Sequence, residues 1–389
     1  MRRFFIVYLA YSAACTPFPS GPESQPVSDA AVPDAGGGLD AGFAAAPPEC
    51  LATPQPPEDA GACPKPVAGA PALLLKMTPL PGEALFAVTS KYAYVISKLE
   101  SFRFPRALIS NVNDGSVLPE CAKEPLPTRT STRENIALLN GALCVAGASG
   151  IDCYLDARDV GAPVRVAPKL AAGIRAFGIS GMGDRLAIAV GASADTTPSD
   201  ALVGPPEGPF TTPAGAFTPW TTGGNYWRYF DGGLVTVGAE RGQNRTARQL
   251  DAKGWAREVV IDDRASSPAF DDLLLIQVSP SRLAGRRAKV VLTADTTNFE
   301  NLADLPDIQA SAFALFDGEP RVALRRKVVP PNAFDRIYRM EAVASDNATQ
   351  FDLRARLAWL RWTVDRQLGI LGTRDCADDT HLFATIVNF

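Results

Sequence analysis

The chain has 389 residues, of which 46% are hydrophobic, so it can bury a sizeable core. Its 38 Lys and Arg residues nearly balance 42 Asp and Glu residues, and the net charge of −4 argues against nucleic acid as the main partner, because phosphate binding needs a basic excess. No apolar run of about 18 residues follows the N-terminus, so the sequence predicts no bilayer-spanning helix.

The first residues read as an export signal. Arg2 and Arg3 form a positive start, residues 4–10 are apolar, and the small residues 12–14 precede Cys15. The apolar stretch is too short to span a membrane, so the sequence predicts a signal peptide over residues 1–14 that is removed on secretion.

The ending of this signal resembles the lipobox of bacterial lipoproteins. In that family the peptidase cuts before the cysteine, whose thiol carries a diacylglycerol with palmitate-type chains, so the resemblance implies lipidation of Cys15. Ser12 departs from the Leu that the family usually has, and ordinary export with Cys15 removed is the alternative. Thr16 stands where an inner-membrane retention signal would have Asp, so the resemblance implies an outer-membrane lipoprotein, facing the periplasm or the surface.

Residues 15–70 are predicted to be a disordered tether. Ala, Pro, Gly and acidic residues dominate it, and no Lys or Arg occurs between Thr16 and Pro64. Such a segment buries too little apolar surface to offset its ordering entropy, and Pro keeps it extended.

From residue 71 onward, short apolar runs alternate with turn residues, and one arrangement recurs about every 46 residues. In it a turn residue precedes an apolar, often β-branched run. The seven turns occur at Lys91, Asn140-Gly141, Asp184, Asp231-Gly232, Asp272, Asp317-Gly318 and Asp365. Asn-Gly and Asp-Gly favour type I′ hairpin turns, so each unit is expected to begin with two strands joined by a tight turn.

The repeat predicts an all-β fold, a β-propeller of seven four-stranded blades over residues 71–389. The layout resembles YVTN and WD-repeat propellers, in which an acidic-Gly turn precedes a short apolar strand; the Gly-His and Trp-Asp signatures of WD repeats are absent. Two β-sandwiches are the alternative, but they do not explain a sustained period. Residues 71–79 are expected to close the ring as the outer strand of the last blade, beside residues 381–389.

Cysteine usage fits an oxidising compartment, because six cysteines remain if Cys15 is lipidated. Cys144 and Cys153 flank a predicted two-residue turn at Ala148-Ser149, which makes them a cross-strand pair. Cys50 and Cys63 could close a small loop in the tether. Cys121 and Cys376 would then staple the first unit to the last, although Cys121 could instead pair with Cys50 or Cys63.

Few residues suggest chemistry. The mature chain has a single histidine, His381, which disfavours a Ser-His-Asp hydrolase. No cofactor is expected, although Asp375, Asp378, Asp379 and His381 could gather a divalent metal; the alternative is a solvated acidic loop before the last strand. Trp220 and Trp227 could stack on a glycan or a protein partner if exposed.

We therefore expect a non-catalytic binding or scaffold module in the envelope, held to the membrane by its lipid, with an envelope protein or glycan as partner and no nucleic acid. The rival hypothesis is a propeller enzyme of the glycosidase or lactone hydrolase type, which would use carboxylates and a metal at the central channel. A third hypothesis is that the protein is a structural subunit of a surface complex.

Overall fold

The structure is a computed structural model of the whole chain. It describes residues 72–75, 84–110, 116–130, 132, 135–147, 150–156, 164–215, 222–239, 246–255, 259–260, 308–316, 319–326, 335–340, 349–353, 356–375 and 380–388. The chain divides into two compact units, Met1–Gly42 and Phe43–Phe389, and every described residue belongs to the second. The signal peptide, Cys15 and the whole of the predicted tether therefore lie outside the described residues.

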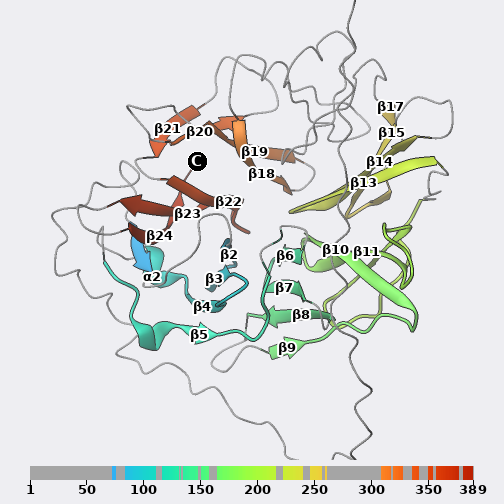
Figure 1. The fold of residues 1–389 in the computed structure, drawn as a ribbon, viewed down its shortest axis with the longest axis horizontal. Coiled ribbons are helices and arrows are strands. Elements are labelled where there is room, and N and C mark those ends of the chain that lie inside the picture. The colour runs from blue at the N-terminus through green and yellow to red at the C-terminus, as the bar shows by residue number, and fades with distance from the viewer. Residues whose placement is uncertain are drawn as a thin grey trace, which may run out of the picture. The chain divides into compact units, whose positions relative to one another are not determined.

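The described strands form six antiparallel sheets, numbered here in chain order and visible as separate meanders in Figure 1. Sheet one contains β2 (Leu85–Val88), β3 (Tyr92–Ile96), β4 (Phe102–Pro105) and β5 (Glu124–Pro125). Sheet two contains β6 (Ile136–Leu139), β7 (Ala142–Gly147), β8 (Gly150–Leu155) and β9 (Val164–Val166). Sheet three contains β10 (Ile174–Met182), β11 (Arg185–Ala192) and β12 (Asp200–Gly204).

The later sheets follow the same plan. Sheet four contains β13 (Thr222–Phe230), β14 (Gly233–Ala239), β15 (Thr246–Asp251), β16 (Gly254–Trp255) and β17 (Val259–Val260). Sheet five contains β18 (Ile308–Phe316), β19 (Glu319–Arg326), β20 (Asp335–Met340) and β21 (Thr349–Leu353). Sheet six contains β22 (Arg356–Trp362), β23 (Leu368–Asp375), β24 (Thr380–Val387) and the N-terminal strand β1 (Leu73–Leu75).

The first strands of the sheets contact one another in sequence: β6 with β10, β10 with β13, β13 with β18, β18 with β22, and β22 with β2. Sheets one and two pack together through a shared apolar cluster. This arrangement is a β-propeller, as predicted, with β2, β6, β10, β13, β18 and β22 as innermost strands. The unit expected at Asp272 lies outside the described residues, so seven blades stay a prediction.

Tight turns lie where the repeat predicted them. Asn140-Gly141 joins β6 to β7, with Leu139 opposite Ala142, and Asp231-Gly232 joins β13 to β14, with Phe230 opposite Gly233. Gly232 has φ +100°, which an L side chain rarely adopts. The hairpin dipeptides therefore marked real hairpins.

The first and last sheets join through β1, which completes sheet six beside β24 as predicted. Leu73 pairs with Ala384 and Leu75 with Leu382. On its other edge, the Leu74 N–H donates to the Ser116 carbonyl and Leu74 accepts from Leu118, both at 2.8 Å. A strand of three residues is thus hydrogen-bonded on both sides.

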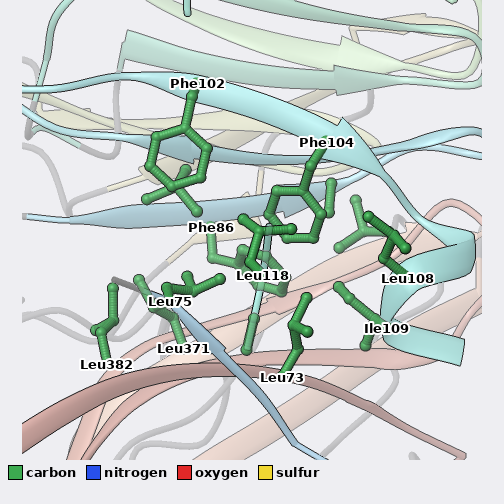
Figure 2. Packing of buried hydrophobic residues seen from close by; sticks show 14 of the residues in the cluster. Leu73, Leu75, Phe86, Phe102, Phe104, Leu108, Ile109, Leu118, Leu371 and Leu382 are labelled. Carbon is green, nitrogen blue, oxygen red and sulfur yellow. The ribbon is translucent and has the colours of Figure 1, made fainter. Parts of the chain in front are cut away.

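A core cluster of sixteen buried residues, the largest among the described part of the chain, fills this seam. Figure 2 shows Leu73 and Leu75 of β1 among aromatic side chains of sheet one and leucines of sheet six. The short helix α2 (Ala107–Ser110) adds Leu108 and Ile109 from one side. A 3-10 turn, Glu120–Ala122, follows in the same connection. In the described part of the chain no helix is long and apolar enough to cross a membrane.

Candidate functional site

An ion pair links the innermost strands of three sheets. Arg361 of β22 donates from Nε and Nη2 to the two carboxylate oxygens of Asp231, at 2.8 and 2.5 Å. Nη2 also lies 3.3 Å from the carbonyl oxygen of Ile136, the first residue of β6. Both charged side chains are about nine-tenths buried, with 10% and 11% exposed. We call this group the central pair.

The central pair limits what the Asp231 carboxylate can do chemically. Both oxygens of Asp231 accept from one guanidinium, a bidentate geometry that is among the stronger charge-assisted interactions. To act as a metal ligand or general base through these lone pairs, the carboxylate must first lose its hydrogen bonds to Arg361. Asp231 therefore serves to connect sheets in this structure.

A second polar group lies between sheets one and two. The register places Tyr94 opposite Arg103 and Arg103 opposite Glu124, so one row crosses β3, β4 and β5. Arg103 is fully buried, and its Nε donates to Glu124 at 2.6 Å. Its guanidinium carbon lies 3.8 Å from the centre of the Tyr92 ring, a cation–π contact. We call these four residues the polar row.

Burial and neighbouring charge shift the pKa of three groups in the polar row, Tyr92, Tyr94 and Arg103, and burial is the main cause for Tyr92. Burial raises the pKa of the Tyr94 hydroxyl, the nearby Asp156 carboxylate raises it further, and Arg103 opposes both. Burial alone would lower the pKa of Arg103, but Tyr94 and Glu124 together raise it. Tyr94 stays neutral and Arg103 stays charged at any physiological pH. The charge state of these two residues therefore does not change, and their role in the polar row is structural.

Asp156, which follows β8, fastens sheet two to the first turn of sheet one. Its carboxylate accepts hydrogen bonds from Thr89 Oγ1 at 3.0 Å, Ser90 Oγ at 3.1 Å and Tyr94 Oη at 3.4 Å. The carboxylate has a structural role here, because all three donors belong to the neighbouring sheet.

Sequence reasoning singled out none of these charges, although two of them stand in apolar runs where a charge is unusual. Arg361 stands inside the apolar run Trp359-Leu360-Arg361-Trp362, and Arg103 stands between Phe102 and Phe104. A charge inside a buried strand requires a partner. The partners lie 130 and 21 residues away, and spacing alone cannot identify them.

Of the two tryptophans proposed to bind a partner, the structure describes Trp227. Trp227 lies in β13 with 5% of its surface exposed, in a core cluster with Tyr229 and Leu234. Its ring meets the Trp255 ring edge-on, with centroids 6.1 Å apart. Trp227 therefore does not meet the condition of exposure that a stacking role requires, because an innermost propeller strand is covered on both faces. Trp220 lies outside the described residues.

The proposed metal ligands fall around one hairpin. Asp375 ends β23 opposite Thr380, and His381 is the second residue of β24, opposite Arg374. Asp378 and Asp379 lie between these strands, outside the described residues. Among the residues that the structure does describe, no three His, Cys, Asp or Glu side chains gather as a metal site. A divalent metal here stays a prediction.

The cysteine pair in the second unit is confirmed. Cys144 of β7 and Cys153 of β8 are directly opposite in the register, and their sulfurs are bonded at 2.00 Å with Cα atoms 4.0 Å apart. Gly147 pairs with Gly150, as the predicted turn requires. Cys121 is also disulfide-bonded. Cys376, Cys50 and Cys63 lie outside the described residues, so the remaining connectivity stays a prediction.

No protein-family model and no curated protein matches this chain. Among solved structures, regucalcin, a calcium-binding protein from Agrobacterium tumefaciens, is similar at 12% identity over 80% of this chain and 94% of its own, with a TM-score of 0.35. A subtype N10 neuraminidase-like protein of A/little yellow-shouldered bat is similar at 7% identity over 81% and 98%, with a TM-score of 0.32. Hsv2 from Kluyveromyces lactis shows 10% identity over 78% and 74%, with a TM-score of 0.28. The propeller assignment rests on the strand pairing described above.

Proposed function

We propose that this protein is an exported, lipid-anchored β-propeller that acts as a non-catalytic binding or scaffold module in the bacterial envelope. The observation that carries the proposal is the central pair: the carboxylate of Asp231 at the innermost strands is held by both its oxygens to Arg361. The buried charges of the polar row are likewise paired with each other. The central pair links sheets, the polar row links strands of sheet one, and both sets of charges are engaged with protein partners.

The sequence supplies the location in this proposal. The lipobox-like ending at Cys15 would place a diacylglycerol at the start of the mature chain, and the Pro- and Ala-rich residues 16–70 would then separate the propeller from the lipid. Thr16 favours the outer membrane. The Cys144–Cys153 disulfide supports an oxidising compartment, since such bonds persist outside the cytosol.

The experiment uses the full chain in its native envelope. Cross-linking before solubilisation, followed by purification and mass spectrometry, should recover one envelope protein in constant ratio to this chain. The Cys15→Ser variant should lose acylation, leave the membrane fraction and lose that partner. Equal solubility of this variant and the wild type would contradict the anchor.

A parallel assay addresses the enzyme alternative. Purified full chain would be tested for metal content and for hydrolysis of glycosides and lactones. Metal-dependent turnover that disappears in Asp375→Asn and His381→Gln, together with no recovered partner, would replace the binding proposal with the enzyme.

A further inference from the structure

The six described sheets follow one another around a ring. Their innermost strands contact in the order β2, β22, β18, β13, β10 and β6, and sheets one and two share an apolar cluster that completes the circle. Sheets two, four and six are therefore alternate members of the ring, with one sheet between each two of them. In a propeller the innermost strands surround a central channel, and its middle is the place that alternate sheets can reach together.

The turn that follows the innermost strand of sheet four is held by its neighbours on both sides. The Gly232 N–H donates to the Gly181 carbonyl of sheet three at 2.6 Å. Asp231 forms an isolated parallel β-bridge with Ala314 of sheet five. The backbone of Asp231 is therefore fixed between sheets three and five, and its side chain starts from the inner rim of the ring.

One guanidinium joins the three alternate sheets. Arg361 starts from β22 of sheet six, and its Nε and Nη2 donate to both carboxylate oxygens of Asp231 in sheet four, at 2.8 and 2.5 Å. The same Nη2 lies 3.3 Å from the Ile136 carbonyl oxygen of sheet two. A group as small as a guanidinium can touch sheets that are not neighbours only where their inner edges converge. The guanidinium of Arg361 therefore lies at the middle of the ring.

We propose that Arg361 is an axial plug, which closes the central channel at the level of Asp231 and Ile136 and ties alternate sheets together. The two charged side chains fill the middle of the ring, and only 10% and 11% of their surfaces are exposed. A ligand that entered the channel from either mouth would meet the central pair before it reached the other mouth. This role adds to the proposed binding function and does not depend on it.

The axial tie differs from the apolar contacts of the ring. A cluster such as that of Leu360 and Ala312 joins neighbouring sheets, here six and five, whereas the central pair joins sheets that are not neighbours. Replacement of Arg361 leaves a buried carboxylate without its partner, which destabilises the fold at that point. We therefore expect a single substitution to loosen sheets two, four and six together.

The test uses the Arg361→Cys variant of the full chain and two methanethiosulfonate reagents, one with an ammonium group and one with a sulfonate group. The thiolate attacks the reagent, forms a mixed disulfide and releases methanesulfinate, so position 361 gains either charge. The ammonium adduct should restore at least half of the melting temperature that the variant loses, and the sulfonate adduct should restore none.

Two controls assign these effects to the channel. The ratio of the ammonium to the sulfonate labelling rate should fall about tenfold when Asp231→Asn is added, because the carboxylate that attracts the cation is then absent. The Leu360→Cys variant should resist both reagents, since Leu360 is 3% exposed and packs between sheets five and six. The wild type treated in the same way serves as the blank for its own cysteines.

Three results would overturn the plug. Position 361 that reacts no faster than position 360 would lie between sheets and not in the channel, and equal restoration by both adducts would exclude the charge tie. If Arg361→Cys does not fold, hydrogen exchange of Arg361→Lys decides. Protection should then fall together in residues 136–139, 227–230 and 359–362, and a loss confined to residues 359–362 would contradict a tie between alternate sheets.

Discussion

The two faces of sheet one are built differently, although they belong to the same strands. Toward sheet six the sheet presents apolar side chains, Phe86, Phe102 and Phe104 among them, which pack on Leu73 and Leu75 of β1. Toward sheet two it presents Leu85 and Tyr94, and beside them the buried charge of Arg103. The side chains alternate between the faces as the pleat requires.

The difference follows from how each interface is assembled. Sheets one and two are consecutive in the chain, so a short connection brings them together and a buried polar pair is tolerated. The seam of β1 with β24 joins residues about 310 positions apart, as Leu73 and Ala384 show. Closing so long a loop costs conformational entropy that only local burial can offset. We therefore expect the seam to depend on apolar packing, and the interface of sheets one and two to depend on its apolar cluster with the polar row beside it.

The largest effect should come from the seam. Leu75→Ala removes a side chain that is 2% exposed from the core of Figure 2, and we expect unfolding free energy to fall by about 3 kcal/mol. Urea denaturation measures it. The matched control is Leu99→Ala, which removes the same atoms from a side chain that is 73% exposed and should change stability by less than about 0.5 kcal/mol. Equal losses in the two variants would mean that β1 does not contribute to the core.

Loss of stability at the polar row should be partly reversed by a second substitution, which is not expected for a lost apolar contact. Arg103→Met leaves Glu124 without its partner at a site that is 21% exposed, and we expect a loss of about 2 kcal/mol. Adding Glu124→Gln should restore at least half of that loss, because no uncompensated carboxylate then remains. A double-mutant cycle from urea denaturation gives the coupling. Additive losses would indicate that Arg103 acts only through its packing.

The disulfide in sheet two should contribute a little less. Cys144 and Cys153 are nine residues apart, and closing so short a loop is worth about 2.6 kcal/mol in a chain-entropy model; because disulfides often deliver less than this model gives, we expect somewhat below about 2 kcal/mol. The Cys144→Ala, Cys153→Ala variant should therefore unfold at lower urea concentration, with an unchanged Leu75→Ala effect on top. If the two effects fail to add, the seam and sheet two are coupled.

The smallest effect concerns the ion pair that Arg106 forms with Asp365 at 2.6 Å. Burial raises the pKa of Asp365, but hydrogen bonds from Arg106 and Thr363 outweigh burial and hold it below the ordinary value of 3.8. A lowered pKa contributes stability above the unfolded value and loses it as pH falls through the folded value. The side chain is 48% exposed, so we expect below about 1 kcal/mol.

The Asp365→Asn variant isolates this contribution. Its stability should match that of the wild type at pH 2 and fall below it at pH 6. Thermal unfolding at both values measures the difference. An offset that is the same at both pH values would assign the effect to packing.

Much of the fold could be predicted from the sequence because the signals are local. A turn dipeptide such as Asn140-Gly141 before an apolar run fixes a hairpin, and counting outward from Ala148-Ser149 gives the register of Cys144 and Cys153. The run Ala72–Met77 had no other place in a closed ring, which identified the closing strand.

The buried charges could not be predicted in the same way. Arg361 reaches Asp231 across 130 residues, and such a pairing depends on how the sheets are arranged. Trp227 was offered as a binding residue only if exposed, and it is 5% exposed, because alternation alone does not tell an innermost strand from a half-exposed one. Local patterns predict strands and turns, whereas the site depends on contacts between sheets.

Hydrogen exchange of the full chain tests the central claim, that β1 is an integral strand which closes the propeller. The amides of residues 73–75 should exchange as slowly as those of residues 382–384, because β1 is hydrogen-bonded to β24 on one edge and to residues 116–118 on the other. In Leu75→Ala both segments should lose protection together. Complete exchange of residues 73–75 at the shortest time, with residues 382–384 still protected, would contradict the account.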